Sequence, residues 1–324
     1  MPANLTPQYY EAEEAFRRAR TKEEKMAALE EMLAVIPKHK GTEKLQADIK
    51  RRLAKLREQE EKRVGSRQDP FVVERQGAGQ VVLMGFPNAG KSSLVAALTR
   101  ARVAVADYPF STPLPVPGMM PYEDIHIQLV DTPPVTEDQI PPGLAGTLRN
   151  ADLIAVVIDA SSDECLDQLT GCIGHLEERR ILRDEVPEGV QAKTWDRLLV
   201  VGNKADVEGS EENLSVIREL LERELPILPV SAATGQNLAE LRERIFRGLG
   251  IIRVYSKVPG KEPDMTAPFV LPRGATVLDM ARAVHRDFPQ RLKNARVWGS
   301  VRFDGQAVPR DYVLADRDIV ELHV

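Results

Sequence analysis

Cysteine is scarce in this chain, and long apolar runs are missing. Cys165 and Cys172 are the only cysteines among 324 residues, and their spacing fits neither a CxxC motif nor a metal site. We therefore interpret them as buried free thiols in a reducing cytoplasm. No apolar run approaches the roughly 18 residues that span a bilayer, so we expect no membrane partner. The polar N-terminus does not resemble a secretory signal, which also favours a cytoplasmic location.

A strong positive charge is missing as well. The formal net charge is −5, and it is unevenly distributed. Residues 1–66 and 253–324 each hold three more basic than acidic side chains, whereas residues 67–252 hold eleven more acidic than basic ones. This balance argues against DNA as a partner, but it allows the end segments to contact RNA phosphates.

The same three segments differ in hydrophobic pattern. Residues 1–66 predict a helical hairpin, because apolar residues recur at three- and four-residue spacing in two runs. Thr21–Glu24 fits a capping box before the first run, and residues 37–41 separate the two. The runs are Met26, Leu29, Leu33 and Ile36, and then Leu45, Ile49, Leu53 and Leu56.

Residues 67–252 alternate short apolar runs with helical patterns. This alternation predicts an α/β domain whose parallel sheet is covered by helices on both faces. The strands are expected near 81–84, 127–130, 153–158, 198–201 and 227–230, and the helices near 91–101, 163–183, 211–224 and 237–249.

Residues 253–324 predict a small α+β unit near the lower size limit for independent folding. Its first part, Val254 to Pro263, is rich in turn-forming residues and is interpreted as a connector. Strands are then expected at 269–271, 296–302 and 319–324, around one helix near 276–286.

Gly85-Phe-Pro-Asn-Ala-Gly-Lys-Ser92 matches G-x-x-x-x-G-K-[ST], a phosphate-binding loop between a strand and a helix. Glycines allow a tight turn that directs backbone N–H groups at phosphate, and the helix N-terminus adds a favourable dipole. Lys91 is expected to neutralise phosphate charge, and the Ser92 hydroxyl is expected to bind Mg²⁺. The predicted binding residues of this loop are Gly85, Asn88, Ala89, Gly90, Lys91, Ser92 and Ser93.

Three further motifs follow predicted strands. Asp131 is placed to hold Mg²⁺, and Asn203-Lys204-Ala-Asp206 matches N-K-x-D, whose carboxylate can accept both N1–H and N2–H of guanine. Ser231-Ala232-Ala233 can offer a backbone N–H to the guanine carbonyl oxygen. Because parallel strands present their carboxyl ends at one edge, the four loops predict a single guanine-nucleotide site for GTP or GDP. An ATPase is disfavoured by Asp206.

With these motifs the chain resembles the Obg-like GTPases, most closely the branch of developmentally regulated GTP-binding proteins. Ala106-Asp-Tyr-Pro-Phe-Ser-Thr112 looks like that family's first switch, which implies a Mg²⁺-binding role for Thr112, with Ser111 as the alternative. Lys50 to Arg57 is similar to the family's basic helical segment. Residues 270–277, 296–299 and 314–320 resemble a TGS domain, of β-grasp type. The resemblance thus implies a Ras-like G domain between a helical hairpin and a TGS domain.

Departures from the family pattern concern the second switch. Pro134 replaces a glycine whose N–H contacts the γ-phosphate in relatives, and proline has no N–H. Val135 stands where Ras-like enzymes carry a water-orienting glutamine, and this apolar replacement is one that the Obg-like family shares. The helical insertion before the guanine motif, expected in this branch, is absent, as is the glycine-rich N-terminal domain of Obg. We interpret the chain as a divergent relative.

The mechanism and the partners leave alternatives open. Asn88 either ligates a K⁺ ion that assists catalysis, as the resemblance implies, or merely tolerates the geometry of the loop. Gln139 or a regulatory protein partner could also orient water. We expect a slow, cation-stimulated GTPase associated with ribosomes or RNA. The competing hypothesis is a scaffold that binds guanine nucleotide without hydrolysing it.

Overall fold

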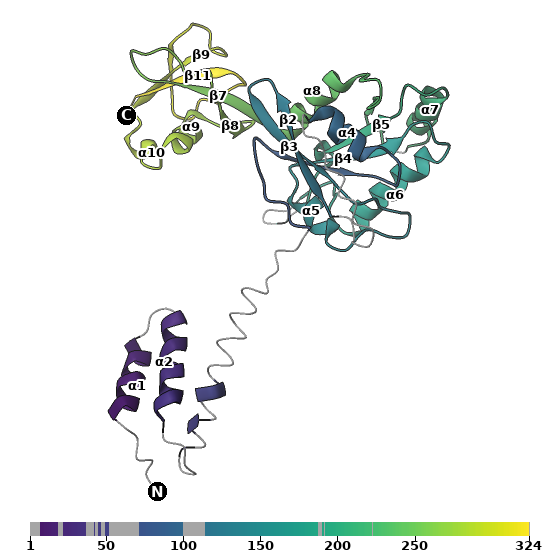
Figure 1. Ribbon diagram of the computed structural model, residues 1–324. Helices are drawn as coiled ribbons and strands as arrows, with labels where there is room; N and C mark the ends of the chain where they lie inside the picture. Colours follow the sequence, from purple (N-terminus) through teal and green to yellow (C-terminus); the bar gives the residue numbers. More distant parts are fainter. Residues whose placement is uncertain are drawn as a thin grey trace. The chain divides into compact units, whose positions relative to one another are not determined.

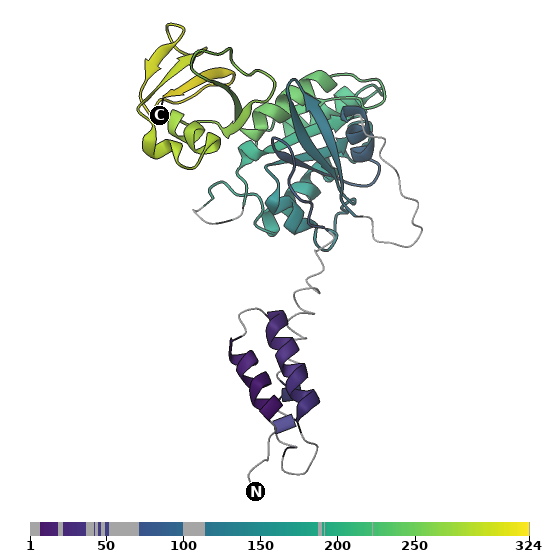
Figure 2. The same ribbon diagram turned by 60° about the vertical axis from the view of Figure 1, so that its left-hand side comes forward.

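A computed structural model of the protein describes residues 7–18, 22–36, 42, 45–46, 49–51, 71–99, 114–186, 190, 192–221 and 223–323. The chain divides into two compact units, Met1–Asp69 and Pro70–Val324 (Figures 1 and 2). Each unit is described by itself below. Among the described residues, no helix has both the length and the apolar character to cross a membrane.

The first unit contains two packed helices, α1 (Pro7–Arg18) and α2 (Lys22–Val35). Tyr9 and Ala12 of α1 lie against Leu29 and Met32 of α2 in a small apolar core. The hairpin was predicted within residues 1–66, but its first apolar run began at Met26 and so did not indicate α1. Residues 45–46 and 49–51 are helical, as expected for the second predicted run. The rest of that run and the capping threonine lie outside the described residues.

The second unit begins with a six-stranded sheet in the order β2-β3-β1-β4-β5-β6. Five strands run parallel, and β2 pairs antiparallel with β3 at the edge. The predicted sheet is therefore present, with one additional antiparallel strand. The strands are β1 (Gln80–Met84), β2 (Val116–Tyr122), β3 (Ile125–Asp131), β4 (Leu153–Asp159), β5 (Leu198–Asn203) and β6 (Ile227–Pro229).

Helices cover both faces of this sheet (Figure 1). Alternate residues of β1 point to opposite faces: Val82 packs with α5, α6 and α7, whereas Val81 packs with α4 and α8. Two apolar cores result, which confirms the expected α/β class. The helices are α4 (Lys91–Leu98), α5 (Leu144–Asn150), α6 (Cys165–Glu178), α7 (Ser210–Leu220) and α8 (Leu238–Leu249), with a short 3₁₀ turn, η1 (Trp195–Arg197).

A second sheet follows directly after α8, with the order β10-β9-β11-β7-β8. Its core is formed with α9 and includes Val254, Met280 and Val297. The yellow-green part of Figure 2 shows this sheet with its helices. The elements are β7 (Ile251–Lys257), β8 (Phe269–Pro272), α9 (Val277–Val284), α10 (Phe288–Arg291), β9 (Asn294–Trp298), β10 (Gln306–Val308) and β11 (Asp318–His323).

The interpretation of Val254 onward as a connector was wrong. Residues 251–257 form β7, which pairs with both β11 and β8, so it lies inside the sheet. Predicted strand 296–302 was misplaced, because β9 ends at Trp298 and Gly299 follows with a φ of 119°. The predicted helix near 276–286 is α9, which Thr276 caps by accepting from the Asp279 backbone N–H.

Candidate nucleotide site

The loop between β1 and α4 turns tightly at two glycines. A Cβ atom on Gly85 would lie 2.3 Å from the Val157 carbonyl oxygen. Gly90 has a φ of 89°, and a Cβ there would lie 2.1 Å from Asn203 Nδ2. Both positions therefore require glycine, for close packing and for backbone conformation. The loop ends at Lys91, the first residue of α4, so the helix N-terminus faces the space enclosed by the loop.

Lys91 is held inside this loop. Its side chain is buried, with 6% of the residue exposed. Its Nζ donates to the carbonyl oxygens of Gly85, at 2.8 Å, and Phe86, at 3.1 Å. Burial lowers the pKa of Lys91, and the nearby Asp131 carboxylate opposes this shift. An ammonium group with so little solvation gains strongly from an anion brought into the loop.

Ser92 and Asp131 form the second polar pair. Ser92 Oγ donates to Asp131 Oδ2 at 2.5 Å. The other carboxylate oxygen, Oδ1, is buried and accepts no hydrogen bond within the described part of the chain. Burial raises the pKa of Asp131, whereas the Ser92 hydrogen bond and Lys91 lower it. A hydroxyl beside a carboxylate with an unused oxygen fits Mg²⁺, which prefers oxygen ligands. The third predicted metal ligand, Thr112, lies outside the described residues, as does Ser111.

Asn203 connects the loop to the far end of the site. Its Nδ2 donates to the Ala89 carbonyl oxygen at 2.9 Å, and its Oδ1 accepts from Ala232 N at 3.1 Å. Both ends of this buried amide are thus engaged by protein, so Asn203 positions two loops. Within the described residues, Ala233 N–H has no acceptor, which leaves it available to a ligand.

Lys204 is ordered by a residue that the sequence motifs did not indicate. Its backbone is left-handed, with a φ of 63°, and its Nζ lies 2.5 Å from Asp159 Oδ2 at the end of β4. This ion pair holds the side chain of Lys204, which lines the same cavity as Asn203. Asp206, two residues further on, lines the cavity.

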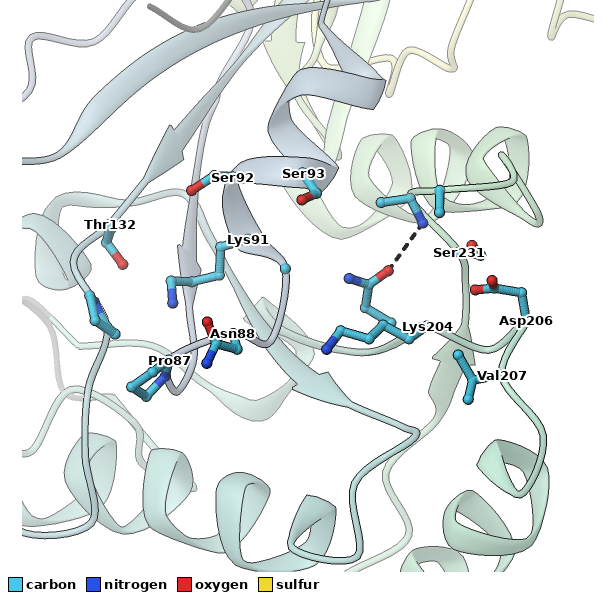
Figure 3. Close-up of a pocket in the computed structure, with 15 residues that line it drawn as sticks. Pro87, Asn88, Lys91, Ser92, Ser93, Thr132, Lys204, Asp206, Val207 and Ser231 are labelled. Atoms are coloured by element: carbon cyan, nitrogen blue, oxygen red, sulfur yellow. Dashed lines mark hydrogen bonds between the residues drawn. The ribbon is translucent and has the colours of Figure 1, made fainter. Parts of the chain in front are cut away.

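One cavity of about 710 Å³ contains most of the predicted residues. Figure 3 shows Lys91 towards one end and Asp206 towards the other, with Lys204 between them. Gly85, Ala89 and Asp131 do not line the cavity. Four lining residues were not among the predicted site residues: Pro87 lies inside the phosphate-loop motif, Thr132 and Pro134 follow Asp131, and Val207 follows Asp206. The predicted residues that line it are Asn88, Gly90, Lys91, Ser92, Ser93, Asn203, Lys204, Asp206, Ser231, Ala232 and Ala233.

Asn88 has left-handed backbone geometry, with a φ of 61°. Asparagine tolerates this conformation better than most residues. This agrees with a conformational role for Asn88, and its position in the cavity wall is also compatible with an ion-binding role.

The segment after Asp131 is fastened to the core of the domain. Val135 is fully buried, and its N–H donates to the Gly85 carbonyl oxygen at 3.1 Å. His175, on α6, donates from Nε2 to the Thr136 carbonyl oxygen at 2.7 Å. Val135 therefore cannot contact a water in the cavity. Its neighbour Pro134 does line the cavity, but proline offers no N–H there.

The sequence did not indicate this contact of His175, since none of the five histidines falls in a motif. The two cysteines are free and buried, as predicted. Both lie on the same helix, α6, on the face that packs against the sheet.

Comparisons with known proteins agree with this geometry. The family described as "50S ribosome-binding GTPase" matches residues 80–204, and the TGS domain family matches residues 252–324. An uncharacterized GTP-binding protein of Methanocaldococcus jannaschii is 31% identical, over 93% of this chain and 92% of that protein. Developmentally-regulated G-protein 1 of Arabidopsis thaliana is 29% identical, over 92% and 90%.

The first of these alignments runs over 364 positions, more than the 324 residues of the chain, so that relative has segments that this chain lacks. Among solved structures, the YchF GTPase of Schizosaccharomyces pombe is similar, with a TM-score of 0.54 and 13% identity. It covers 77% of this chain and 99% of that one, and at this identity the similarity concerns the fold alone.

Proposed function

Since this chain belongs to the Obg-like GTPases, in the branch of developmentally regulated GTP-binding proteins with a TGS domain, we propose that it hydrolyses GTP to GDP and phosphate. We propose further that it acts as a ribosome- or RNA-associated switch. The observation that carries the proposal is the single cavity with Lys91 towards one end and Asp206 towards the other. An anion-binding end and a base-reading end in one cavity suit a nucleoside triphosphate.

At the phosphate end, Lys91 would exchange its contacts with two loop carbonyls for phosphate oxygens. Ser92, Asp131 and Thr112 would hold Mg²⁺, which would neutralise charge on the β- and γ-phosphates. At the base end, the Asp206 carboxylate would accept from N1–H and N2–H of guanine, whereas adenine presents no such donor pair. The free N–H of Ala233 would then donate to the guanine carbonyl oxygen.

We expect slow intrinsic hydrolysis, because Val135 is buried and no glutamine follows the second-switch position. Asn88 is the residue at which K⁺ would add positive charge near the phosphates. The test is steady-state GTP turnover in potassium and in sodium, with Lys91→Ala as the inactive control. Equal rates in the two salts remove Asn88 from the mechanism.

The ribosome or RNA partner rests on two features. The family that matches residues 80–204 is described as ribosome-binding. In the C-terminal segment, Arg286, Arg291 and Arg296 are exposed, and Lys50 and Arg51 precede the central domain. A ribosome or RNA partner would also be consistent with the proposed cytoplasmic location. Co-sedimentation with ribosomal subunits should increase with a non-hydrolysable GTP analogue and fall with added salt; indifference to both contradicts the proposal.

The competing function is a scaffold that holds guanine nucleotide without turning it over. Pro134, which lacks an N–H, and the buried Val135 favour it. Radiolabelled GTP incubated with the protein in potassium, with ribosomal subunits present, separates the two functions. Phosphate release above that of Lys91→Ala supports the enzyme, and absence of release supports the scaffold.

We propose three domains: a helical hairpin at 1–66, a G domain at 67–252 and a TGS domain at 253–324. The TGS family match begins at residue 252, which supports the second boundary. Limited proteolysis followed by mass spectrometry tests the first boundary, with cleavage expected near residue 66.

A further inference from the structure

A buried arginine lies where the second sheet meets the first. Arg253, on β7, is 3% exposed, although it carries a full charge. Three carboxylates surround its guanidinium group: Glu123, Asp124 at 2.8 Å and Asp316 at 2.7 Å. A buried charge requires such partners, because removal from water is costly. Arg253 is therefore held in one orientation.

Two of these carboxylates form the tip of the β2–β3 hairpin. The last paired residues are Tyr122 and Ile125, so Glu123 and Asp124 make a two-residue turn. Arg253 binds both side chains, and Tyr255 of the same strand donates from its hydroxyl to Asp124. The second sheet thus binds the β2–β3 hairpin of the first sheet at its turn, through hydrogen bonds and ion pairs.

Residues of a neighbouring loop and of α8 make further contacts with this turn. Arg317 donates to Glu123 Oε2 at 2.6 Å, and its backbone N–H donates to the Arg253 carbonyl oxygen at 2.7 Å. Tyr122 stacks on Phe246 of α8, with ring centroids 4.9 Å apart, and the Arg253 guanidinium lies 4.9 Å from the Phe246 ring centroid. Charged and apolar contacts therefore fix the same turn.

Strained backbone marks both sides of this contact. Glu123 has a φ of 50° and Arg317 a φ of 70°, although neither is glycine. Non-glycine residues adopt this region at a cost, and they do so where surrounding contacts enforce it. A turn that served only to connect two strands would be expected to carry asparagine or glycine at such positions.

The opposite end of the hairpin belongs to the nucleotide site. Residue pairing is continuous from Tyr122↔Ile125 to Val116↔Asp131. The hairpin therefore runs from the turn that Arg253 binds to Asp131, the carboxylate proposed to hold Mg²⁺. Figure 1 shows β2 and β3 extending from the first sheet towards β8 and β7. The turn and Asp131 therefore belong to one continuous hydrogen-bonded ladder.

We propose that Arg253 is a positioning residue for the nucleotide site: through the β2–β3 hairpin, it lets the docking of the TGS domain set the placement of Asp131. This inference rests on the proposed metal site. The coupling is reciprocal. If docking of the TGS domain raises the affinity for nucleotide and metal by some factor, then bound nucleotide and metal raise the affinity of the docking contact by the same factor.

The test is the dissociation rate of a fluorescent GDP from the full-length chain, measured in Mg²⁺ and in EDTA. Arg253→Gln removes the charge on the side of the second sheet, and Glu123→Gln removes the charge on the side of the hairpin turn. Each should raise the rate in Mg²⁺ by about tenfold, within the range usual for coupled sites, and leave the rate in EDTA within about twofold. Arg253→Lys, which keeps the charge, should recover part of the wild-type rate.

The matched control is Arg282→Gln, an exposed arginine paired with Asp279 within α9, which should behave as wild type in both solutions. Equal acceleration in Mg²⁺ and EDTA, or none, overturns the positioning role and leaves the proposed metal site intact. A wild-type rate that is the same in Mg²⁺ and EDTA removes the metal site itself, and the inference with it. If Arg253→Gln fails to fold, Glu123→Gln decides alone.

Discussion

Asn203 and Ala89 are 114 residues apart in sequence, and the side-chain amide of the first donates to the backbone carbonyl of the second at 2.9 Å. The same amide accepts a hydrogen bond from the Ala232 backbone. One buried side chain therefore sets the distance between the phosphate-binding loop and the loop proposed to contact the base.

Replacing Asn203 with alanine should weaken nucleotide binding without removing a direct contact. The Ala89 carbonyl and the Ala232 N–H would both lose a partner, which costs about 1–3 kcal/mol for each buried group left unsatisfied. We expect the Kd for GDP to rise at least tenfold, measured by titration calorimetry. The control is Gln236→Ala, at an exposed position on the loop that carries Ala232. An unchanged Kd would show that the two loops keep their spacing without Asn203.

Asp206→Asn should change which base is preferred. An amide has one acceptor oxygen and one donor group, so it cannot accept from both N1–H and N2–H of guanine. It can donate to the additional carbonyl oxygen of xanthine. We expect affinity for GDP to fall roughly 100-fold, because the variant loses a hydrogen bond to a charged acceptor, worth about 1.5–3 kcal/mol, and we expect xanthosine diphosphate to become preferred. Competition against a fluorescent nucleotide measures both; retained GDP preference would argue against base recognition by Asp206.

Pro134→Gly restores a backbone N–H at the cavity wall. If that position senses the γ-phosphate, the variant should bind a non-hydrolysable GTP analogue more tightly relative to GDP, by about fivefold for one hydrogen bond of roughly 1 kcal/mol. Pro142→Gly adds the same backbone freedom at an exposed position and serves as the control. A shift of equal size in both variants would indicate flexibility alone.

Arg253→Gln should destabilise the protein in a pH-dependent way. Hydrogen bonds from Arg253 and Arg317 hold the pKa of Glu123 below its ordinary value. Burial raises the pKa of Asp316, but hydrogen bonds from Arg253 outweigh it and the net shift is downward. Lowered carboxylate pKa values stabilise the fold above about pH 4, the unfolded value, and this stabilisation is lost as the pH falls through the folded pKa.

The loss at pH 7 should be about 3–5 kcal/mol, since removing one partner leaves buried charges uncompensated. Urea unfolding of wild type and variant at pH 7 and pH 3 measures it. The difference between the two proteins should shrink at pH 3. A difference that grows on acidification would contradict the role assigned to these carboxylates.

The central sheet and the cavity could be predicted because their signals are local. Parallel strands buried on both faces are continuous apolar runs, and a phosphate loop has fixed glycine and lysine spacing. The edge strand β2 was missed for the opposite reason. It contains Pro117 and Pro121, which sequence patterns associate with loops, although an edge strand accommodates proline.

Other features depend on tertiary contacts and leave little trace in sequence. The strand β7 was concealed by Pro259, Gly260 and Pro263, which follow it closely and dominate the composition of that stretch. His175 acquires its role only because α6 brings it to the Thr136 carbonyl. Arg253 appears in the sequence as one charge inside a short apolar run, Ile251 to Tyr255. No periodicity indicates that it is buried.

The position of Cys172 has a practical consequence. It lies on α6 close enough to Lys91 for the two groups to interact electrostatically, and burial raises the pKa of its thiol to about 12. Cys165 is buried on the same helix. A thiol reagent can therefore modify either cysteine only when the domain opens. The rate of thiol labelling therefore measures the rate or extent of this opening without an engineered probe. A tightly bound ligand should lower the labelling rate.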